Sequence, residues 1–229
     1  MTGIRPIVIA LDGPAASGKS STAQAVAAEL GFRYLDSGAF YRTITLAALD
    51  QGIPAEEWPD LSRELLNDLS VGSEPSGSGY TLSIDGVPVG DRIRAPEVNA
   101  HVARMAAVPA VRHWLLEALR EAGRDGGLVA DGRDIGTVVF PDAELKVFLV
   151  CDPEERALRR LRQQGQADPD QAAIRAEAGR LVERDRQDES REAAPLLRAP
   201  DAVMLDTTGL SFDAQVRAIT RLAHARAGA

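Results

Sequence analysis

The sequence predicts an α/β fold in which a central parallel sheet is flanked by helices, with a small antiparallel sheet inserted into it and a helical lid. Three observations support this. The first fifty residues read as strand, helix, strand and helix, the order that builds a parallel sheet. A glycine-rich turn separates the first strand from the first helix. Farther on, residues 80–89 alternate around a hairpin turn, which indicates a separate antiparallel sheet.

Apolar spacing defines the elements of the first part of the chain. Ile7–Leu11 is a nearly continuous apolar run, typical of a strand that is buried on both faces. Residues 21–30 carry apolar side chains at helical spacing, and Gly31 stands where a helix commonly ends. A second strand is expected over Phe32–Leu35, and Ser37 is placed to cap the helix that follows it.

The middle of the chain has a different composition. Residues 73–79 are rich in serine and glycine and are expected to form a loop. Tyr80–Ile84 then alternates, and the Asp-Gly pair at 85–86 is a strong turn signal before the chain returns as a second strand. A long helical stretch begins after Pro96, and Pro109 is expected to break or kink it.

The remaining chain contains three short apolar runs and three helical patterns. Strands are expected at residues 128–130, 145–150 and 202–205, and helices at 153–164, 171–186 and 213–225. We expect a single domain over residues 1–229. Its core is assigned to residues 1–36, 97–151 and 190–229, an inserted subdomain to about 37–96, and the lid to about 152–170.

Composition narrows the classes of function. The chain is 45% apolar, which suits a globular core, and its net charge of −8 argues against a general binder of nucleic acid or anionic membranes. Cys151 is the one cysteine, so no internal disulfide can form, and no apolar run has membrane length. We expect a cytoplasmic monomer without nucleic-acid or membrane partners. Of the 26 basic residues only Lys19 and Lys146 are lysines, and arginine binds phosphates and carboxylates through paired hydrogen bonds.

Residues 13–20, Gly-Pro-Ala-Ala-Ser-Gly-Lys-Ser, match the phosphate-binding P-loop pattern G-x-x-x-x-G-K-[ST]. Its glycines allow backbone N–H groups to surround phosphate oxygens, and the following helix presents its positive end. Lys19 is placed to reach the β- and γ-phosphates, and the hydroxyl of Ser20 to ligate Mg²⁺. The expected ATP-binding residues are Gly13, Pro14, Ala15, Ala16, Ser17, Gly18, Lys19, Ser20 and Ser21.

A P-loop indicates a nucleoside triphosphate but not the reaction. A GTP-dependent switch would need a guanine-reading Asn-Lys-x-Asp segment, which the sequence lacks. A motor-type ATPase would need more chain and a recognisable second Walker segment. The remaining interpretation is a kinase of a small anionic acceptor, which predicts arginines around the site. A non-catalytic nucleotide-binding module is the alternative from a different class.

Two segments at strand ends carry side chains that suit such an acceptor. Ser37 and Arg42 follow the second strand, and parallel sheets bind ligands at the carboxyl ends of their strands. Asp131, Arg133 and Asp134 follow the strand at 128–130. There Arg133 can hold phosphate, and the carboxylates can accept hydrogen bonds or support hydrated Mg²⁺. A helix cap and an ion-paired turn are the structural alternatives for the two segments.

Two charged segments in the last third of the chain admit two interpretations each. Arg184, Asp188 and Arg191 share one face if they lie on a helix, and the carboxylate can then orient both guanidinium groups, although the same pattern is common on solvated surfaces. Residues 154–162 form either a lid whose arginines close over the phosphates or a solvated helix with Glu–Arg pairs. Within the lid, Arg156 and Arg160 are the expected phosphate ligands.

Taken together, the segments resemble bacterial cytidylate kinases, and the resemblance covers essentially the whole chain. It is carried by the P-loop and by residues 130–142, Ala-Asp-Gly-Arg-Asp-Ile-Gly-Thr-Val-Val-Phe-Pro-Asp, a run that is very specific to this family among P-loop kinases. The small sheet near residues 70–95 resembles the family's enlarged monophosphate-binding domain. Further matches are residues 36–42, 109–112, 183–191, 193–196 and 205–208.

The resemblance implies the reaction ATP + (d)CMP → ADP + (d)CDP, with ATP as phosphoryl donor and Mg²⁺ as cofactor. For this reaction we predict that Lys19, Mg²⁺ and the lid arginines Arg156 and Arg160 neutralise charge on the moving phosphoryl group. The resemblance also assigns the acceptor phosphate and its surroundings to Ser37, Arg42, Arg133 and Arg184, with Asp131 beside them, the sugar hydroxyls to Asp188, and the cytosine edge to Arg112, Asp134 and Arg191.

One position departs from the family pattern. The family commonly has a serine that contacts the base nine residues before Arg112, and this sequence has Ala103 there. One hydrogen bond to the pyrimidine is therefore either missing or supplied by Asn99, Arg104 or water. How strictly UMP is rejected stays open, and a P-loop kinase of UMP or of another small acceptor is the alternative.

Overall fold

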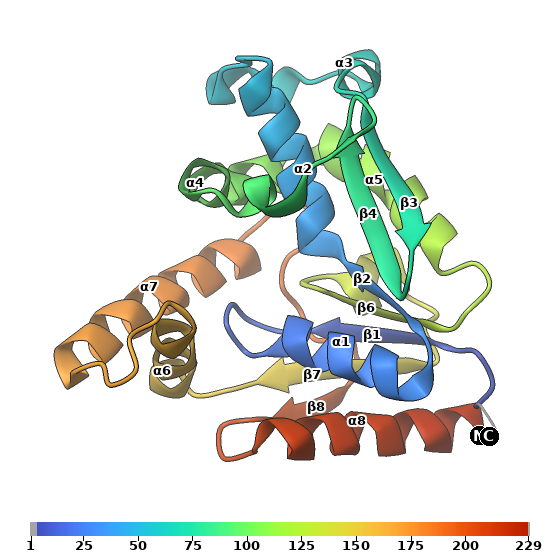
Figure 1. Cartoon of the computed structure of the whole chain (residues 1–229), viewed down its shortest axis with the longest axis vertical. Helices are drawn as coiled ribbons and strands as arrows, with labels where there is room; N and C mark the ends of the chain where they lie inside the picture. Colours follow the sequence, from blue (N-terminus) through green and yellow to red (C-terminus); the bar gives the residue numbers. More distant parts are fainter. Residues whose placement is uncertain (1–3, 229) are drawn as a thin grey trace.

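A computed structural model of the chain describes residues 4–228. Its centre is a five-stranded parallel sheet (Figure 1). The strands are β1 (Val8–Asp12), β2 (Arg33–Asp36), β6 (Leu128–Gly132), β7 (Leu145–Val150) and β8 (Val203–Asp206). They lie in the order β2-β6-β1-β7-β8, which confirms the predicted parallel α/β core. Residues 1–3 of the predicted core and residue 229 lie outside the described residues.

Side chains of β1 alternate between two apolar clusters, because successive residues of a strand point to opposite faces. Ile9 and Leu11 pack in one cluster with α1 (Lys19–Leu30) and α8 (Phe212–Ala227). Ala10 belongs to the other cluster, on the opposite face of the sheet. Both faces are therefore covered, which explains the nearly continuous apolar run. Among residues 4–228, no helix combines the length and the apolarity that crossing a membrane requires.

The first helices lie where they were expected, with one correction at a cap. Gly31 ends α1 with a φ of +68°, in the left-handed region that favours glycine. Helix α2 spans Ser37–Asp50, and its cap is Asp36, whose carboxylate accepts a hydrogen bond from the N–H of Ala39 at 3.0 Å. Ser37 does not cap α2 because it already belongs to the first helical turn, which leaves its hydroxyl free for another partner.

The small antiparallel sheet is confirmed, and it is longer than predicted. Its strands are β3 (Val71–Ser76), β4 (Gly79–Ile84) and β5 (Val87–Pro88), in that order. Residues 73–76, whose composition predicts a loop, form most of β3 and pair with β4. Because β3 is an edge strand, Pro75 is tolerated there, and pairing with β4 outweighs the weak strand preference of serine and glycine.

The helical stretch after Pro96 consists of two helices, α4 (Pro96–Met105) and α5 (Pro109–Ala122). Pro109 stands in the first turn of α5, where its missing N–H costs nothing, so the predicted break is confirmed. Both helices pack in one apolar cluster with α2 and the sheet, so the boundary of the insert near residue 96 stays a prediction. The insert also holds α3 (Arg63–Asp68) and two 3-10 turns, η1 (Ala55–Asp60) and η2 (Gly90–Arg94).

Two helices, α6 (Pro153–Gln163) and α7 (Gln171–Glu189), pack against each other beside the turn that follows β1 (Figure 1). The predicted lid, residues 152–170, covers α6 and the connection to α7. Ala157, Ala178 and Leu181 form a buried apolar cluster with Ala15 of the P-loop. Both helices are therefore packed directly against the P-loop.

Candidate active site

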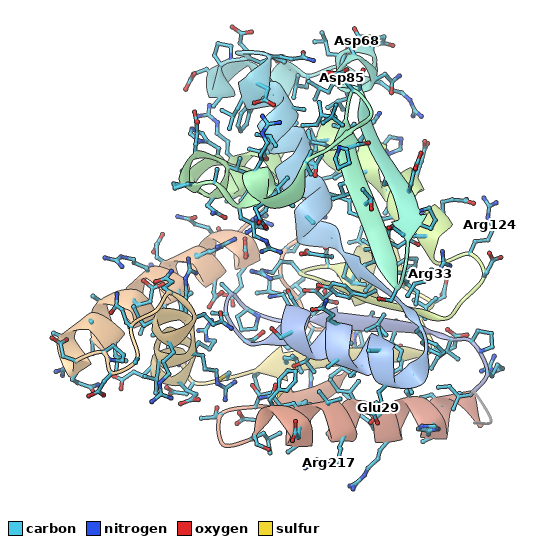
Figure 2. The ribbon with its side chains drawn as sticks, in the orientation of Figure 1. Glu29, Arg33, Asp68, Asp85, Arg124 and Arg217 are labelled. Carbon is cyan, nitrogen blue, oxygen red and sulfur yellow. The ribbon has the colours of Figure 1, made fainter. Side chains whose placement is uncertain are left out.

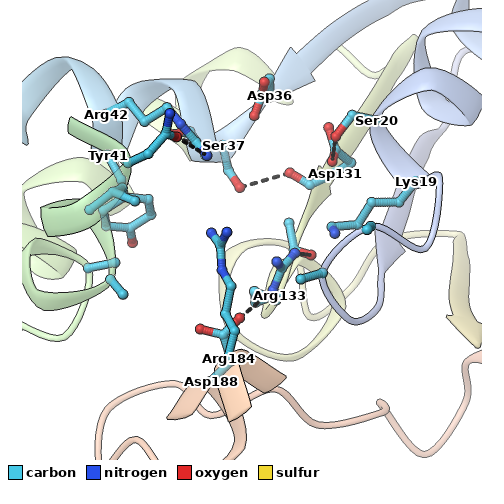
Figure 3. A pocket seen from close by; sticks show the side chains of 18 of the residues that line it. Lys19, Ser20, Asp36, Ser37, Tyr41, Arg42, Asp131, Arg133, Arg184 and Asp188 are labelled. Carbon is cyan, nitrogen blue, oxygen red and sulfur yellow. Dashed lines mark hydrogen bonds and ion pairs between the residues drawn. The ribbon is translucent and has the colours of Figure 1, made fainter. Parts of the chain in front are cut away.

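A cavity of about 410 Å³ lies at the carboxyl ends of the parallel strands, where α/β sheets bind ligands (Figure 3). Its lining holds eight basic and four acidic side chains, so an excess of positive charge gathers there in a chain of net charge −8. The lining includes all nine residues expected to bind the acceptor: Ser37, Arg42, Arg112, Asp131, Arg133, Asp134, Arg184, Asp188 and Arg191.

Many other arginines lie far from this cavity. Arg217 on α8 and Arg124 after α5 are exposed at the periphery of the molecule, as Figure 2 shows. The arginine-rich composition is therefore only partly explained by the cavity.

Two glycines give the P-loop its path. Gly13 has a φ of +154°, and a Cβ there would stand 2.6 Å from the carbonyl oxygen of Leu149, so a side chain is excluded. Gly18 has a φ of +86° and leads directly into α1. This path brings Ala15, Ala16, Lys19 and Ser20 to the cavity wall, and a glycine-rich turn of this kind is the form that cradles phosphate oxygens.

Lys19 lies folded over this loop. Its ammonium donates a hydrogen bond to the carbonyl of Pro14 at 3.0 Å, and its side chain is buried. Burial lowers the pKa of Lys19 to about 7, and the nearby cations Arg133 and Arg184 contribute to the shift. Burial and these cations therefore disfavour the charge of Lys19, and an anion bound beside it would offset both effects.

Asp131 joins the P-loop to two neighbouring elements. Its carboxylate accepts hydrogen bonds from the hydroxyl of Ser20 at 2.7 Å and from the hydroxyl of Tyr34 at 2.8 Å. Its backbone carbonyl accepts from the hydroxyl of Ser37 at 2.8 Å, which is the partner that replaces the expected capping role of that serine. Burial, with the nearby carboxylate of Asp36, raises the pKa of Asp131 to about 6.

Asp188 binds two arginines at once. Arg133 donates to one carboxylate oxygen at 2.7 Å, and Arg191 pairs with the other. Burial opposes its ionisation, but these two cations outweigh burial and hold the pKa of Asp188 below its usual value. The expected single helical face needs one correction, because α7 ends at Glu189 and Arg191 lies beyond it. The ion pair forms all the same, since Arg191 is only one turn away.

Arg184 is one of the cavity's cations that have no counter-ion among the described residues. Within residues 4–228 it forms no ion pair, and its guanidinium points into the cavity toward Ser37 (Figure 3). Burial, together with Arg133, lowers the pKa of Arg184 to about 10. A half-buried guanidinium held among other cations is a strong candidate to bind an anion.

Arg42 lies beside it and is oriented by Asn99. One guanidinium nitrogen donates to the side-chain carbonyl of Asn99 at 3.3 Å, and the amide of Asn99 donates to the Arg94 carbonyl at 2.6 Å. Asn99 and Ala103, one turn later on α4, both line the cavity. From the sequence, Asn99 was expected only as a substitute contact for the base. In the structure its side-chain carbonyl accepts a hydrogen bond from Arg42.

The far end of the cavity holds a nearly buried pair, Arg112 with Asp134. Arg112 also donates to the carbonyl of Ala106 at 3.0 Å and lies over the ring of Tyr41, 5.5 Å from its centroid. Burial raises the pKa of Asp134, although Arg112 opposes the shift. Tyr41 is a lining residue that sequence reasoning missed, since an aromatic side chain inside a helix gives no local signal of this role.

Asp12 is a second residue that the sequence argument missed. At the end of β1, its carboxylate accepts hydrogen bonds from the N–H groups of Ile135 at 2.8 Å and Gly136 at 2.7 Å, and so fixes the turn that presents Asp134. Burial raises the pKa of Asp12 to about 6. The sequence did offer a signal for Asp12, because a charged residue directly after the apolar run Ile7–Leu11 lies at the carboxyl end of a buried strand.

The two arginines expected in the lid lie in different places. Among the described residues, the cavity lining includes Arg160 but not Arg156. Arg160 is bound to the buried carboxylate of Glu177 at 3.0 Å. Arg156 is itself buried and pairs with Asp185 at 2.5 Å. In this conformation Arg156 is therefore engaged by protein groups and not presented to phosphates.

The chain is similar to known proteins over most of its length. The family model described as cytidylate kinase matches residues 9–225. A cytidylate kinase of Chlorobaculum tepidum is 46% identical, over 94% of this chain and 92% of that relative. A bifunctional pantoate ligase/cytidylate kinase of Synechococcus sp. (strain WH7803) is 45% identical over 95% of this chain, which spans 44% of that relative. An uncharacterized protein of Eubacterium ventriosum shares the fold, with a TM-score of 0.50 at 11% identity, over 95% of this chain and 97% of its own.

Proposed function

The chain belongs to the cytidylate kinase family, and from this membership we propose that it transfers the γ-phosphoryl group of ATP to CMP and dCMP. The products are ADP and CDP or dCDP. One observation carries the proposal: a single cavity joins a P-loop to a group of arginines and aspartates. Phosphoryl transfer needs this arrangement, because two anions must be brought together and the charge between them stabilised.

We assign the acceptor phosphate to the middle of the cavity. Arg184 supports this assignment because its charge has no counter-ion within residues 4–228, and Arg42 and Arg133 lie near enough to influence it. Ser37 stands at the start of α2, where a hydroxyl and the positive helix end suit a phosphate. The sugar hydroxyls are assigned to Asp188, whose oxygens each keep a second lone pair beside their bonds to arginine.

The base is assigned to the Arg112–Asp134 end of the cavity. A carboxylate accepts hydrogen bonds, so Asp134 suits the exocyclic amine of cytosine and opposes the carbonyl of uracil at the same position. Arg112 and Arg191 suit the acceptor atoms of the same edge. Ala103 supplies no hydrogen bond of its own, so the discrimination of CMP from UMP rests on Asp134 more heavily than the family pattern implies.

The chemistry is mostly positioning and charge stabilisation. The phosphate of CMP is already ionised, so the attacking oxygen needs no strong general base. Lys19 binds the outer phosphates of ATP, whose charge offsets the burial and the neighbouring cations that disfavour its ammonium. Arg160 at the cavity wall is placed to share the charge of the moving phosphoryl group. Packing of the lid helices over the site excludes water and limits the hydrolysis of ATP.

Mg²⁺ is implied by the family, and the residues around Ser20 fit it. Mg²⁺ keeps several waters and binds through one or two carboxylates and substrate phosphates instead of a protein cage. The hydroxyl of Ser20 lies 2.7 Å from the carboxylate of Asp131, and Asp36 also lines the cavity. No group of three or more potential His, Cys, Asp or Glu ligands occurs in the described chain, which suits an ion carried by ATP. When bound, the ion neutralises phosphate charge.

A panel of acceptors tests the proposal. ADP release is measured with ATP and, in turn, CMP, dCMP, UMP and AMP. We expect turnover with CMP and dCMP to exceed that with UMP at least about tenfold. Faster turnover with UMP would favour the alternative, a UMP kinase. ATP binding without turnover of any acceptor would favour a non-catalytic module. We further propose that the enzyme works as a monomer in the cytoplasm, a setting that its single buried cysteine, Cys151, suits.

A further inference from the structure

Both polar groups of the Ala15 backbone are bound by charged side chains of α6 and α7. The carboxylate of Asp185, on α7, accepts a hydrogen bond from the N–H of Ala15 at 2.8 Å. The guanidinium of Arg156, on α6, donates to the carbonyl of Ala15 at 2.9 Å. Arg156 and Asp185 also pair with each other at 2.5 Å. These three residues close a ring of hydrogen bonds, which we name the Ala15 clasp.

The clasp is buried, unlike the Arg186–Glu183 pair of the same helix. Arg156 is 4% exposed and Asp185 is 7% exposed, and an apolar cluster of α6 and α7 packs against Ala15 beside them. By contrast, Arg186 and Glu183 form an exposed pair at 3.9 Å, of the kind that contributes little. Burial of an ion pair costs desolvation free energy, which only close contact between the partners offsets. Removal of one partner leaves the other as an unpaired buried charge.

The position of the clasp links the two substrate sites. Asp185 directly follows Arg184 and lies one turn before Asp188, so a single helix carries two acceptor residues and the ligand of the P-loop. On the other side, Ala15 itself lines the cavity next to the loop that holds Lys19. A displacement of α7 therefore carries the P-loop and Arg184 together, unless the clasp breaks.

We propose that Asp185 is a positioning residue that couples the ATP site to the acceptor site through the Ala15 clasp. Asp185 is not assigned a contact with either substrate. It fixes the P-loop against α7, so that the γ-phosphoryl group and the phosphate held by Arg184 are aligned. Binding of one substrate then favours binding of the other, and this effect is reciprocal. The inference rests on the proposed kinase function.

Asp185→Asn is the first test variant. The asparagine keeps the size and can still accept from the Ala15 N–H, but its NH₂ group opposes the donor of Arg156, so the ring opens. Three quantities are measured: kcat with both substrates saturating, the Kd of CMP for the enzyme without nucleotide, and that Kd with a non-hydrolysable ATP analogue. We expect kcat to fall at least thirtyfold, the first Kd to stay within threefold, and the effect of the analogue, at least fivefold in the wild type, to disappear.

Two further variants make the test decisive. Arg156→Met with Asp185→Leu removes both charges together, which avoids an unpaired buried charge and preserves folding, and it should lose kcat and coupling to the same extent. Glu183→Gln, on the exposed face of α7, should change none of the three quantities. Circular dichroism checks that each variant is folded.

The outcomes separate this inference from the proposed function. A wild type without CMP-dependent turnover contradicts the proposed function itself. If the wild type turns over CMP, three results would overturn the inference alone. The first is that the ATP analogue does not tighten CMP binding, and the second is that both clasp variants keep kcat within threefold. The third is that the variants lose CMP affinity without nucleotide by the same factor as kcat. In the last case Asp185 serves the acceptor site alone.

Discussion

The two halves of the cavity are built in opposite ways. The half assigned to ATP is lined by Ala15, Ala16, Lys19 and Ser20, which belong to one continuous segment, the P-loop at residues 13–20. The acceptor half is assembled from side chains of α2, α5, α7 and the end of β6, and nearly every one is held by an ion pair or a hydrogen bond to a distant residue. A site formed by one local segment tolerates substitution of its residues other than glycine. The acceptor half depends instead on partners that are distant in the sequence.

Lys19→Met should break the ATP half with the largest effect. The variant loses the compact cation that meets the outer phosphates, so we expect kcat/KM for ATP to fall roughly 10³-fold. The Kd of CMP for the enzyme without nucleotide should stay within about threefold of the wild-type value, or tighten, since a repelling neighbour of Arg184 is removed. Equal losses at both sites, measured by steady-state kinetics and calorimetry, would contradict the separation of the halves.

Asp12→Asn tests where the two halves join, since Asp12 ends the strand that leads to the P-loop and yet holds the turn of the acceptor half. Its pKa is about 6 in the folded protein against 3.8 ordinarily, so its contribution to stability is full below pH 3.8 and is lost as pH rises through 6. The free energy of unfolding of the wild type, relative to the variant, should decrease by about 2 kcal/mol between pH 4 and pH 7.

Urea unfolding of both proteins at several pH values measures this difference. Asp131 titrates in the same range but is present in both proteins, so its contribution cancels. A difference that stays constant from pH 4 to pH 7 would show that the Asp12 carboxyl has an ordinary pKa.

Arg184→Ala should break the acceptor half while the ATP half is retained. The lost interaction is a charge-assisted hydrogen bond to phosphate, so kcat/KM for CMP should fall roughly fiftyfold. The affinity for ATP should change less than about twofold, as measured by titration without CMP. Arg186→Ala, two residues on and exposed, is the matched control and should leave both quantities unchanged.

Asp134→Asn should give the smallest of these effects and refine the assignment within the acceptor half. The amide can donate to the carbonyl of uracil as well as accept from the amine of cytosine, so the preference for CMP over UMP should drop about tenfold. The ratio of kcat/KM for the two acceptors measures it. An unchanged ratio would assign base recognition to other residues of the cavity.

The same contrast explains what could be predicted from the sequence. The P-loop and the parallel core are local patterns, with a strand, a fixed spacing and a helix, so both were predictable. Strand ends and helical spacing pointed to Arg42, Arg133 and Arg184, but each kept a structural alternative. The family resemblance was needed to assign all three to one acceptor site, because they come together only through tertiary folding. Partners such as Asn99 and Asp12 were missed for that reason. The strand at 73–76 was missed because pairing with β4 overrode local preference. The cap was placed one residue too late, because Asp36 and Ser37 are both suitable capping residues and only the structure shows that Asp36 accepts from the Ala39 N–H.

Because the cavity holds an excess of positive charge, the stability of the folded protein should depend on bound nucleotide. Eight basic side chains face four acidic ones there, and their mutual repulsion weakens the empty fold. An anionic substrate relieves it and binds the native state alone, so resistance to heat and proteolysis should rise with the CMP concentration. By the same reasoning, the Arg184→Ala variant should melt at a higher temperature than the wild type when neither protein holds a substrate. The substitution that removes acceptor binding would then increase stability at the expense of activity.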